Sequence, residues 1–374
     1  MDVREETGRK TPMTARLVPA RPMKRPAEFT RTIASVSGAT PIVADMQSFV
    51  GRNDNWRVPT VEAGDLFVKR LRGDRAHVET RMRRMLAFQQ VIAGHRADEL
   101  RTVPFRGSDL EQGLLVFDYV PESRTGADLL ASGELDTETA YRIGRILGEI
   151  HRLPRPAADL PEGVEGRKAT AFYALSPEDY ANCSGGEVEA WAMLQHDKVL
   201  VEALNRLHRT SAEAPATAVH GDIRLDQFLF AGDDLYVVDW EEFRYSDPAR
   251  DVGSFAGEFV HHAVVRMFAE LDVDPALAPG AAHEAIVAAG DQQLANVREH
   301  IRRFWCGYRE VAEIDDGLAV RATGYIGWHF FDRLLAGAVH GGRLSAVERG
   351  TAGIGRNALI QPERFAATIG LGED

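Results

Sequence analysis

The chain has 374 residues, enough for two lobes, and its apolar and charged fractions of 44% and 27% are those of an ordinary globular protein. Its formal net charge of −12 is the opposite of the basic footprint expected of a nucleic-acid-binding protein. No apolar run reaches the length of a membrane-spanning helix. We therefore expect neither a nucleic-acid partner nor a membrane span.

The acidic charge and the cysteines narrow the class of protein further. The charge fits a solvated surface that keeps the protein dissolved, or a field that attracts a cationic substrate. Cys183 and Cys306 are too few for a disulfide framework and lack the spacing of metal ligands. Charged residues precede any apolar segment at the N-terminus, unlike in a secretory signal. We expect inert thiols and a cytoplasmic location.

Residues 1–31 differ in composition from the rest of the chain. They contain eight lysines and arginines, four acids and four prolines, with no helical or strand period. This composition predicts a flexible basic arm, with the folded protein beginning at residue 32. An alternative is that the arm docks on a partner or on the acidic body.

The segment from residue 47 to 120 is predicted to form a small antiparallel sheet with one helix. Residues 56–61 and 66–71 have the pattern of two strands around a turn, and residues 101–105 and 114–120 add further strands. The polar loop 49–55 contains one glycine, typical of an ordinary turn or of a loop over phosphates. Apolar residues recur every three or four positions between 78 and 92, which predicts a helix.

The chain beyond Pro121 has mostly helical patterns. Asp136 is the predicted N-cap of a helix over 137–152, in which Gly144 and Gly148 permit close packing of another helix. Residues 155–186 are irregular. Further helices are predicted over 187–208, 254–271, 281–312 and 317–339, followed by a glycine-rich tail.

The most informative stretch begins with His-Gly-Asp at 220–222 and ends at Asp239. Its apolar segments flank a turn at 232–234, so we expect a hairpin that brings Asp222 and Asp239 to one mouth. Phosphoryl transfer uses such a pair of carboxylates. One orients the attacking hydroxyl and accepts its proton, and the other holds the metal that bridges the nucleotide phosphates. Glu241 and Glu242 follow directly and are candidates to face a cationic acceptor.

These residues resemble those of the aminoglycoside phosphotransferase and choline kinase superfamily, distant relatives of protein kinases. The resemblance lies in residues 220–222, the amide of Gln227, the strand that ends in Asp-Trp-Glu at 239–241, and Asp-Pro-Ala-Arg-Asp at 247–251. It implies an α+β, bilobed, protein-kinase-like fold. A small antiparallel β N-lobe over 32–120 would bind the nucleotide. A larger helical C-lobe over 121–374 would carry catalysis and bind the substrate.

The resemblance also implies roles for the residues of the catalytic stretch. Asp222 is the implied catalytic residue and Asp239 the principal magnesium ligand, with ATP and Mg²⁺ as cofactors. Gln227 lies where the family has a metal-binding Asn, and its extra methylene moves the amide oxygen by about 1.5 Å. It would hold a second ion or a shared water. His220 and Asp251 would support the catalytic loop.

Lys69 and Glu79 are the implied residues of the nucleotide site in the N-lobe. Lys69 follows two apolar residues on the second strand of the hairpin, where kinases place the lysine that contacts the α- and β-phosphates. Glu79 lies in the first turn of the next helix and is the candidate to pair with Lys69. The helix dipole alone also favours an acid there. Residues 114–120 resemble the linker whose backbone pairs with an adenine edge.

The identity of the phosphate acceptor stays open between classes. Residues 224–227, 239–244 and 247–253 more closely resemble kinase subunits of class V lanthipeptide and thioamitide biosynthesis. This implies phosphorylation of Ser or Thr in a natural-product precursor peptide, after which a separate lyase or cyclase subunit eliminates the phosphate to leave a dehydroamino acid. The alternatives are a small-molecule antibiotic kinase for aminoglycosides or macrolides, and a catalytically weak pseudokinase, which Gln227 supports. The choice of ATP or GTP also stays open.

Overall fold

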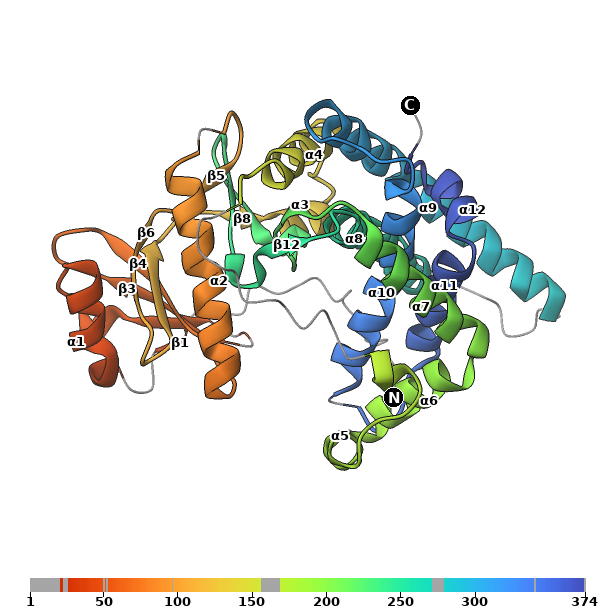
Figure 1. Ribbon diagram of the computed structural model, residues 1–374, viewed down its shortest axis with the longest axis horizontal. Helices are drawn as coiled ribbons and strands as arrows, with labels where there is room; N and C mark the ends of the chain where they lie inside the picture. The colour runs from red at the N-terminus through yellow and green to blue at the C-terminus, as the bar shows by residue number, and fades with distance from the viewer. Residues whose placement is uncertain are drawn as a thin grey trace, which may run out of the picture.

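The computed structural model describes residues 21–22, 26–49, 51, 53–95, 97–155, 169–270, 279–339 and 341–372. A strand-rich N-terminal part lies beside a larger helical part, as Figure 1 shows. The strands of the first part form an antiparallel sheet, and helices dominate the chain after it. The predicted α+β class is therefore confirmed.

The N-terminal sheet has six strands in the order β1-β2-β3-β4-β7-β6, and every neighbouring pair is antiparallel. Its strands are β1 (Arg21–Pro22), β2 (Gln47–Phe49), β3 (Asp54–Pro59), β4 (Asp65–Arg70), β6 (Phe105–Asp109) and β7 (Leu114–Asp118). The expected hairpin is confirmed as β3 and β4. Trp56, Val58, Leu66 and Val68 alternate with more exposed residues along these strands and form the buried face of the sheet.

A helix, α1 (Pro26–Ser37), extends the folded part toward the N-terminus. Phe29 stacks on Trp56 with ring centroids 5.4 Å apart, and Ile33 is fully buried one helical turn later. The predicted boundary of the arm at residue 31 is therefore wrong, because an apolar pair four residues apart lies among the basic residues and packs on the sheet. The rest of the predicted arm, residues 1–20 and 23–25, lies outside the described residues.

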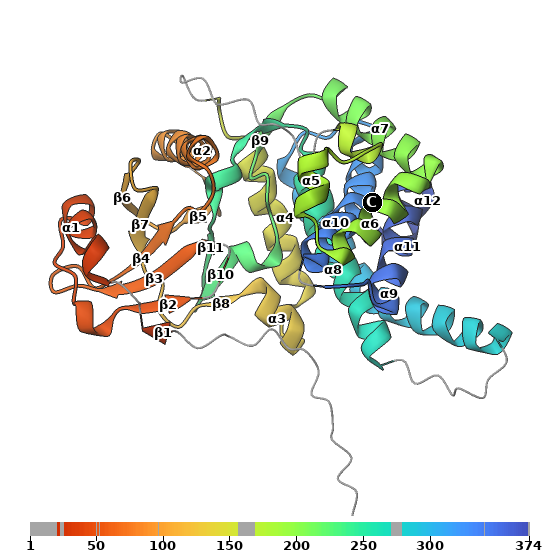
Figure 2. The same cartoon turned by 90° about the horizontal axis from the view of Figure 1, so that it is seen from below.

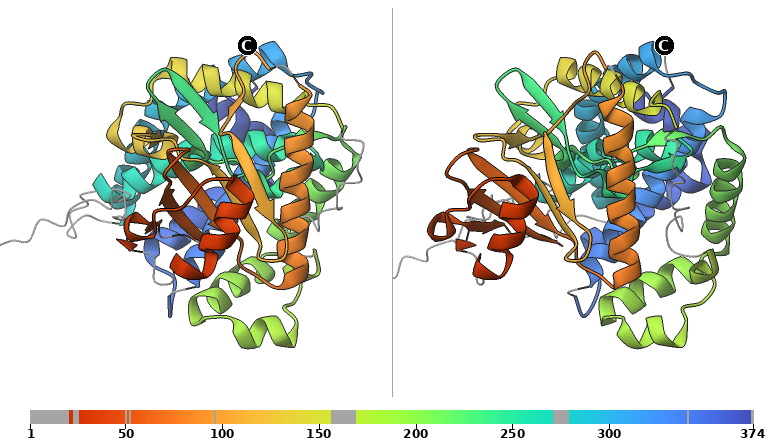
Figure 3. Two further views of the ribbon diagram at one scale, coloured as in Figure 1. Left: turned by 90° about the vertical axis from the view of Figure 1, so that its left-hand side faces the viewer. Right: turned by 60° about the vertical axis from the view of Figure 1, so that its left-hand side comes forward.

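The helix α2 (Arg75–Ala93) confirms the helix predicted from apolar spacing. The Asp74 side chain caps its first turn. Met85 and Phe88 are buried, and the Phe88 ring stacks on Trp240 with centroids 3.7 Å apart. As a result α2, orange in Figure 3, stands between the sheet and the helical part and contacts both.

A second sheet lies between the N-terminal sheet and the helices, as Figure 2 shows. Its order is β5-β11-β10-β8, built from β5 (Arg101–Thr102), β8 (Arg124–Thr125), β10 (Phe228–Ala231) and β11 (Asp234–Val237). The hairpin predicted within residues 220–239 is confirmed as β10 and β11. The expectation that residues 101–105 join the N-terminal sheet is wrong for Arg101 and Thr102, which pair in parallel with β11 instead. It is confirmed for Phe105, the first residue of β6, which pairs with Phe117 of β7.

The helical part is built around one large apolar core. Its helices are α3 (Gly126–Ser132), α4 (Thr137–His151), α5 (Pro177–Asn182), α6 (Gly185–His196), α7 (Lys198–Glu213), α8 (Ala249–Glu270), α9 (Pro279–Val311), α10 (Leu318–Ala338), α11 (Ala346–Ile360) and α12 (Pro362–Ile369). Asp136 caps α4, as predicted. A Cβ at Gly148 would lie 2.7 Å from the Val311 Cβ of α9, so the glycines of α4 do allow close helix packing.

One expectation for the helical part is wrong. The helix predicted over 187–208 is two helices, α6 and α7, because the chain turns at Asp197 and its side chain caps α7. The glycine-rich tail contains the two helices α11 and α12. Gly355 of α11 allows a close contact there, since a Cβ at this position would lie 2.7 Å from the Cβ of Phe330.

Two further expectations concern thiols and membranes. Cys183 and Cys306, both within the described ranges, are not joined in a disulfide. Among the helices in the described ranges, none combines the length and the apolar character needed to cross a bilayer.

Candidate active site

The catalytic stretch follows strand β9 (Thr217–Val219), which pairs with β12 (Arg244–Ser246). Asp251, at the start of α8, is fully buried and accepts hydrogen bonds from the backbone N–H groups of His220 at 2.6 Å and Gly221 at 3.0 Å. His220 is also buried, and its Nε2 donates to the Val238 carbonyl oxygen at 2.9 Å. These bonds tie the loop that carries Asp222 to α8 on one side and to the end of β11 on the other.

The buried Asp251 carboxyl is held ionised by its partners. Burial alone would raise its pKa, but hydrogen bonding and charge from His151, the charge of His220 and the Gly221 N–H lower it below the usual value. His151 in turn contacts the Tyr308 hydroxyl through Nδ1 at 2.8 Å. The loop is therefore fixed by a carboxylate that stays charged under ordinary conditions.

Asp222 projects from this loop with half of its side chain exposed. Loss of hydration in the surrounding cleft raises its pKa, the neighbouring Arg224 opposes that change, and the negative charge of Asp239 adds to it. The Arg224 guanidinium lies 3.8 Å from the Asp222 carboxylate and 3.2 Å from that of Asp226. Asp222 and Asp239 are thus within electrostatic reach of each other, which the predicted hairpin geometry requires.

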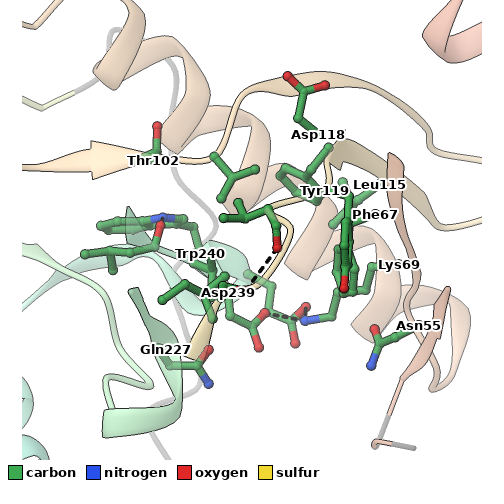
Figure 4. A pocket seen from close by; sticks show the side chains of 18 of the residues that line it. Asn55, Phe67, Lys69, Thr102, Leu115, Asp118, Tyr119, Gln227, Asp239 and Trp240 are labelled. Atoms are coloured by element: carbon green, nitrogen blue, oxygen red, sulfur yellow. Dashed lines mark hydrogen bonds and ion pairs between the residues drawn. The ribbon is translucent and has the colours of Figure 1, made fainter. Parts of the chain in front are cut away.

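Asp239 lies at the end of β11 in the left-handed backbone region, with φ 73° and ψ 50°. Few residues other than glycine adopt this conformation, and those that do are concentrated at functional sites. The turn points the carboxylate toward β4, where it forms an ion pair with Lys69 (Figure 4). Burial would raise the pKa of Asp239, but the charge and hydrogen bond of Lys69 outweigh it and the pKa is lowered.

Lys69 is 8% exposed, although it lies on the edge of a cavity. Burial lowers its pKa, and Asp239 partly offsets that change. Its second partner is Glu241, whose Oε2 lies 2.8 Å from the Lys69 Nζ. A lysine of this kind carries its charge into a poorly hydrated space, where it acts strongly on any anion that enters.

The cavity between the two sheets and α2 has a volume of about 380 Å³. Most of its lining is apolar and aromatic, with contributions from β2, β4, β7, β10 and β11: Phe49, Phe67, Leu115, Phe117, Leu229 and Val237. The linker residues Tyr119 and Val120 also line it, and Phe49 stacks on Tyr119 at 6.5 Å. Lys69, Gln227 and Asp239 belong to its polar lining and lie near one another in Figure 4. The remaining polar lining residues are Asn55, Gln89, Thr102, Asp118, Ser123, Thr125, Asp128 and Glu241. The cavity therefore combines flat aromatic rings with a charged group around Lys69 and Asp239.

Gln227 is buried in the short turn η3 (Leu225–Gln227), and its backbone carbonyl accepts from the Val238 N–H at 3.0 Å. This bond places it beside the strand that ends in Asp239, and both side chains line the same cavity. An amide oxygen and a carboxylate are the hard donors that Mg²⁺ prefers in proteins. The donor set therefore fits one such ion bound mainly through substrate phosphates.

Glu79 does not pair with Lys69, and this prediction is corrected. Its side chain is 39% exposed and forms an ion pair with Arg83, four residues later on the same helix, at 2.5 Å. The reason is the direction in which each side chain leaves the helix. Met82, Met85 and Phe88 form the buried face of α2, and Glu79 lies outside that face.

The side of α2 that faces the site contains arginines instead. Arg81 and Arg84 are buried, and they pair with Glu241 and Glu242 of the turn η4 (Trp240–Glu242). The expectation that these two acids face a cationic acceptor is therefore wrong. Sequence reasoning missed both arginines, although their spacing with Met82, Met85 and Phe88 marks them as part of one face.

Comparison with known proteins identifies the class to which this fold and site belong. Residues 50–292 match the model of the phosphotransferase enzyme family, which is more than half of the chain, and the chain belongs to this family. It is therefore a phosphotransferase. A comparison with curated protein sequences gave no match.

Solved structures share the fold at low sequence identity. Choline kinase LicA from Streptococcus pneumoniae has a TM-score of 0.54 and 13% identity, covering 89% of this chain and 97% of its own. Amicoumacin kinase hAmiN, solved with AMP-PNP, Ca²⁺ and amicoumacin, has a TM-score of 0.53 and 13% identity, with coverages of 90% and 93%. A choline/ethanolamine kinase family protein from Mesorhizobium loti has a TM-score of 0.50 and 17% identity, with coverages of 92% and 100%. The predicted kinase-like fold is confirmed.

Proposed function

We propose that this protein transfers the γ-phosphoryl group of ATP to a hydroxyl group in a magnesium-dependent reaction. The observation that carries the proposal is that Lys69, Gln227 and Asp239 line one largely apolar cavity, with Asp222 in electrostatic reach. The aromatic surface suits a nucleobase and the charged groups suit a triphosphate. The boundary between a nucleotide-binding lobe and a catalytic lobe would then fall near residue 120.

Each polar residue of the cavity has a distinct role in this proposal. Lys69 binds the phosphates, because its buried ammonium is oriented by carboxylates and opens on the cavity. Asp239 is the principal magnesium ligand and Gln227 the second oxygen donor, to an ion or to a water on it. Magnesium held by these two residues would supply positive charge to neutralise the negative charge that develops during transfer.

Asp222 is the proposed proton acceptor for the attacking hydroxyl. Its raised pKa makes it a better base than an ordinary aspartate. Arg224 lies beside it and opposes that rise. His220 and Asp251 hold the loop through main-chain bonds and do not exchange protons with the substrate. Rate enhancement then comes mainly from alignment and charge neutralisation.

For the acceptor we propose a Ser or Thr hydroxyl of a natural-product precursor peptide. The sequence of the catalytic loop, Arg224 to Gln227, supports this proposal through its resemblance to lanthipeptide and thioamitide kinase subunits. The exposure of Asp222, Arg224 and Asp226, at 50%, 35% and 49% of their side chains, also supports it. A solvent-exposed surface around Asp222 suits an acceptor that binds as an extended chain. A separate lyase would consume the phosphorylated product.

A small-molecule acceptor is the second candidate. The fold is shared with kinases whose names give choline and amicoumacin as their ligands, and choline carries a fixed positive charge. The formal net charge of −12 would attract a cationic acceptor of this kind.

A transfer assay with γ-³²P-labelled ATP separates the candidates. The panel contains Ser- and Thr-rich peptides encoded beside the gene, aminoglycosides, macrolides and choline, and Asp222→Asn is the negative control. Labelled peptide supports the precursor-peptide proposal, and labelled small molecule supports the second candidate instead. Nucleotide binding with no labelled product in the whole panel contradicts both acceptor proposals.

A further inference from the structure

Lys69 has a carboxylate partner that the expected kinase arrangement does not supply. Its Nζ lies between Asp239 and Glu241, which both follow strand β11, and α2 provides no acid to it. If Asp239 binds the metal when nucleotide enters, its carboxylate is shared with a cation of higher charge. Glu241 is then the carboxylate left to hold the lysine in place.

Glu241 is itself immobilised from two further elements. Its Oε1 accepts from the Arg81 guanidinium of α2 and from the Asn53 side-chain amide at 3.3 Å. The Asn53 Oδ1 accepts from the Arg72 backbone N–H at 3.1 Å, so the residue before β3 is fixed as well. Glu241 and Arg81 are 7% and 2% exposed. One buried carboxylate thus joins β4, α2 and the loop before β3.

The neighbouring residue, Glu242, also forms an ion pair with an arginine of α2. Arg84 of α2 pairs with its carboxylate at 2.5 Å, and Arg244 donates to its carbonyl oxygen at 3.0 Å. Between the two ion pairs, the Phe88 and Trp240 rings are stacked with an interplanar angle of 6°. The two arginines are on α2 and the two acids are on η4, and these ion pairs hold α2 against η4. In the arrangement predicted from the sequence, the helix would instead supply an acid to a lysine on a strand.

We infer that Glu241 positions Lys69 for the nucleotide phosphates and that α2 acts on the site through Arg81. This inference rests on the proposed phosphate-binding function of Lys69. Glu241 already balances two buried cations, Lys69 and Arg81, which leaves little negative charge for a metal ion. It is therefore a positioning residue and not a second metal ligand. Movement of α2 would change the site through the Arg81–Glu241–Lys69 chain.

The test uses Glu241→Gln, Arg81→Met and the double variant. For each variant, calorimetry gives the dissociation constant of Mg·ATP, and urea unfolding gives the midpoint of denaturation. Glu241→Gln weakens Mg·ATP binding about tenfold, or about 1.4 kcal/mol. It also lowers the urea midpoint, because the buried Arg81 loses its nearer counterion and keeps only Glu242 at 3.7 Å. Arg81→Met weakens binding less, because Glu241 still holds Lys69. The double variant recovers much of the urea midpoint but keeps the weakened binding.

The matched control is Glu189→Gln, which removes a carboxylate from an arginine pair between α6 and the start of α11, remote from the cavity. Its Mg·ATP affinity equals that of the wild type. Recovery of both stability and affinity in the double variant would overturn the inference, because Glu241 would then act on stability alone. So would a Glu241→Gln variant that needs much more Mg²⁺ for half-saturation, since that outcome makes Glu241 a metal ligand.

A Lys69→Ala variant separates this inference from the proposed function on which it depends. If Lys69→Ala weakens Mg·ATP binding and Glu241→Gln does not, the positioning role fails and the phosphate role stands. If Lys69→Ala binds Mg·ATP as tightly as the wild type, the assignment of Lys69 to the phosphates fails first.

Discussion

Replacement of Asp251 by Asn tests whether the catalytic loop is held from α8. The wild-type carboxylate accepts two backbone N–H groups, from His220 and Gly221, inside fully buried surroundings. An Asn side chain offers one acceptor and one donor, so one of the two N–H groups faces a donor. A buried donor left without an acceptor costs roughly 1–3 kcal/mol. Asp251→Ala removes both acceptors and doubles that cost to roughly 2–6 kcal/mol.

The loss of activity is expected to exceed the loss of stability. A loop displacement of about 1 Å at Asp222 reduces turnover on the order of 100-fold, even at temperatures where the Asp251→Asn variant stays folded. Asp247→Asn is the control, since Asp247 is equally buried and pairs with Arg321, and its partners lie outside the catalytic loop. Urea unfolding and the phosphoryl-transfer rate are measured on both variants. Equal turnover of the two variants would refute the bracing role of Asp251.

Two further predictions concern stability. Gly144→Ala should destabilise the protein by roughly 1–3 kcal/mol, because the added methyl would overlap the Phe304 carbonyl of α9; Gly353→Ala, with open space around it, is the control in thermal unfolding. Burial would raise the pKa of Glu258, but His329 and Arg333 lower it to about 2. Its contribution to stability should be complete above about pH 4.5, the usual value, and be lost as the pH falls toward 2. A constant difference in urea midpoint between wild type and Glu258→Gln from pH 7 to pH 3 would contradict this.

Local patterns in the sequence were sufficient for the elements that depend on neighbours along the chain. The turn at 232–234 between two apolar segments predicts β10 and β11, and Asp136 before a 3.6-residue period predicts the start of α4. Long-range pairing is different. β5 joins β11 across more than a hundred residues, and no local feature of Arg101 and Thr102 indicates a parallel partner.

The ion pairs around Lys69 could not be predicted from the sequence for the same reason. Arginine on a helix is normally solvated, so Arg81 and Arg84 give little reason to expect burial. Their partners Glu241 and Glu242 lie about 160 residues later, and only the folded chain brings them together. For Glu79 the sequence predicted a contact that the structure does not contain. This glutamate is the right residue type at an expected place, but the apolar face of α2 determines the phase and turns Glu79 to the surface.

The central claim is that Asp222 and Asp239 serve one bound Mg·ATP in different ways, and nucleotide titration of two variants tests it most directly. Calorimetry with ATP is run with Mg²⁺ and with EDTA on wild type, Asp222→Asn and Asp239→Ala, beside the transfer rate of each. The account predicts that Asp222→Asn binds Mg·ATP like the wild type and transfers no phosphate, while Asp239→Ala loses the magnesium-dependent part of binding. Full magnesium-dependent binding by Asp239→Ala, or undiminished transfer by Asp222→Asn, would contradict it.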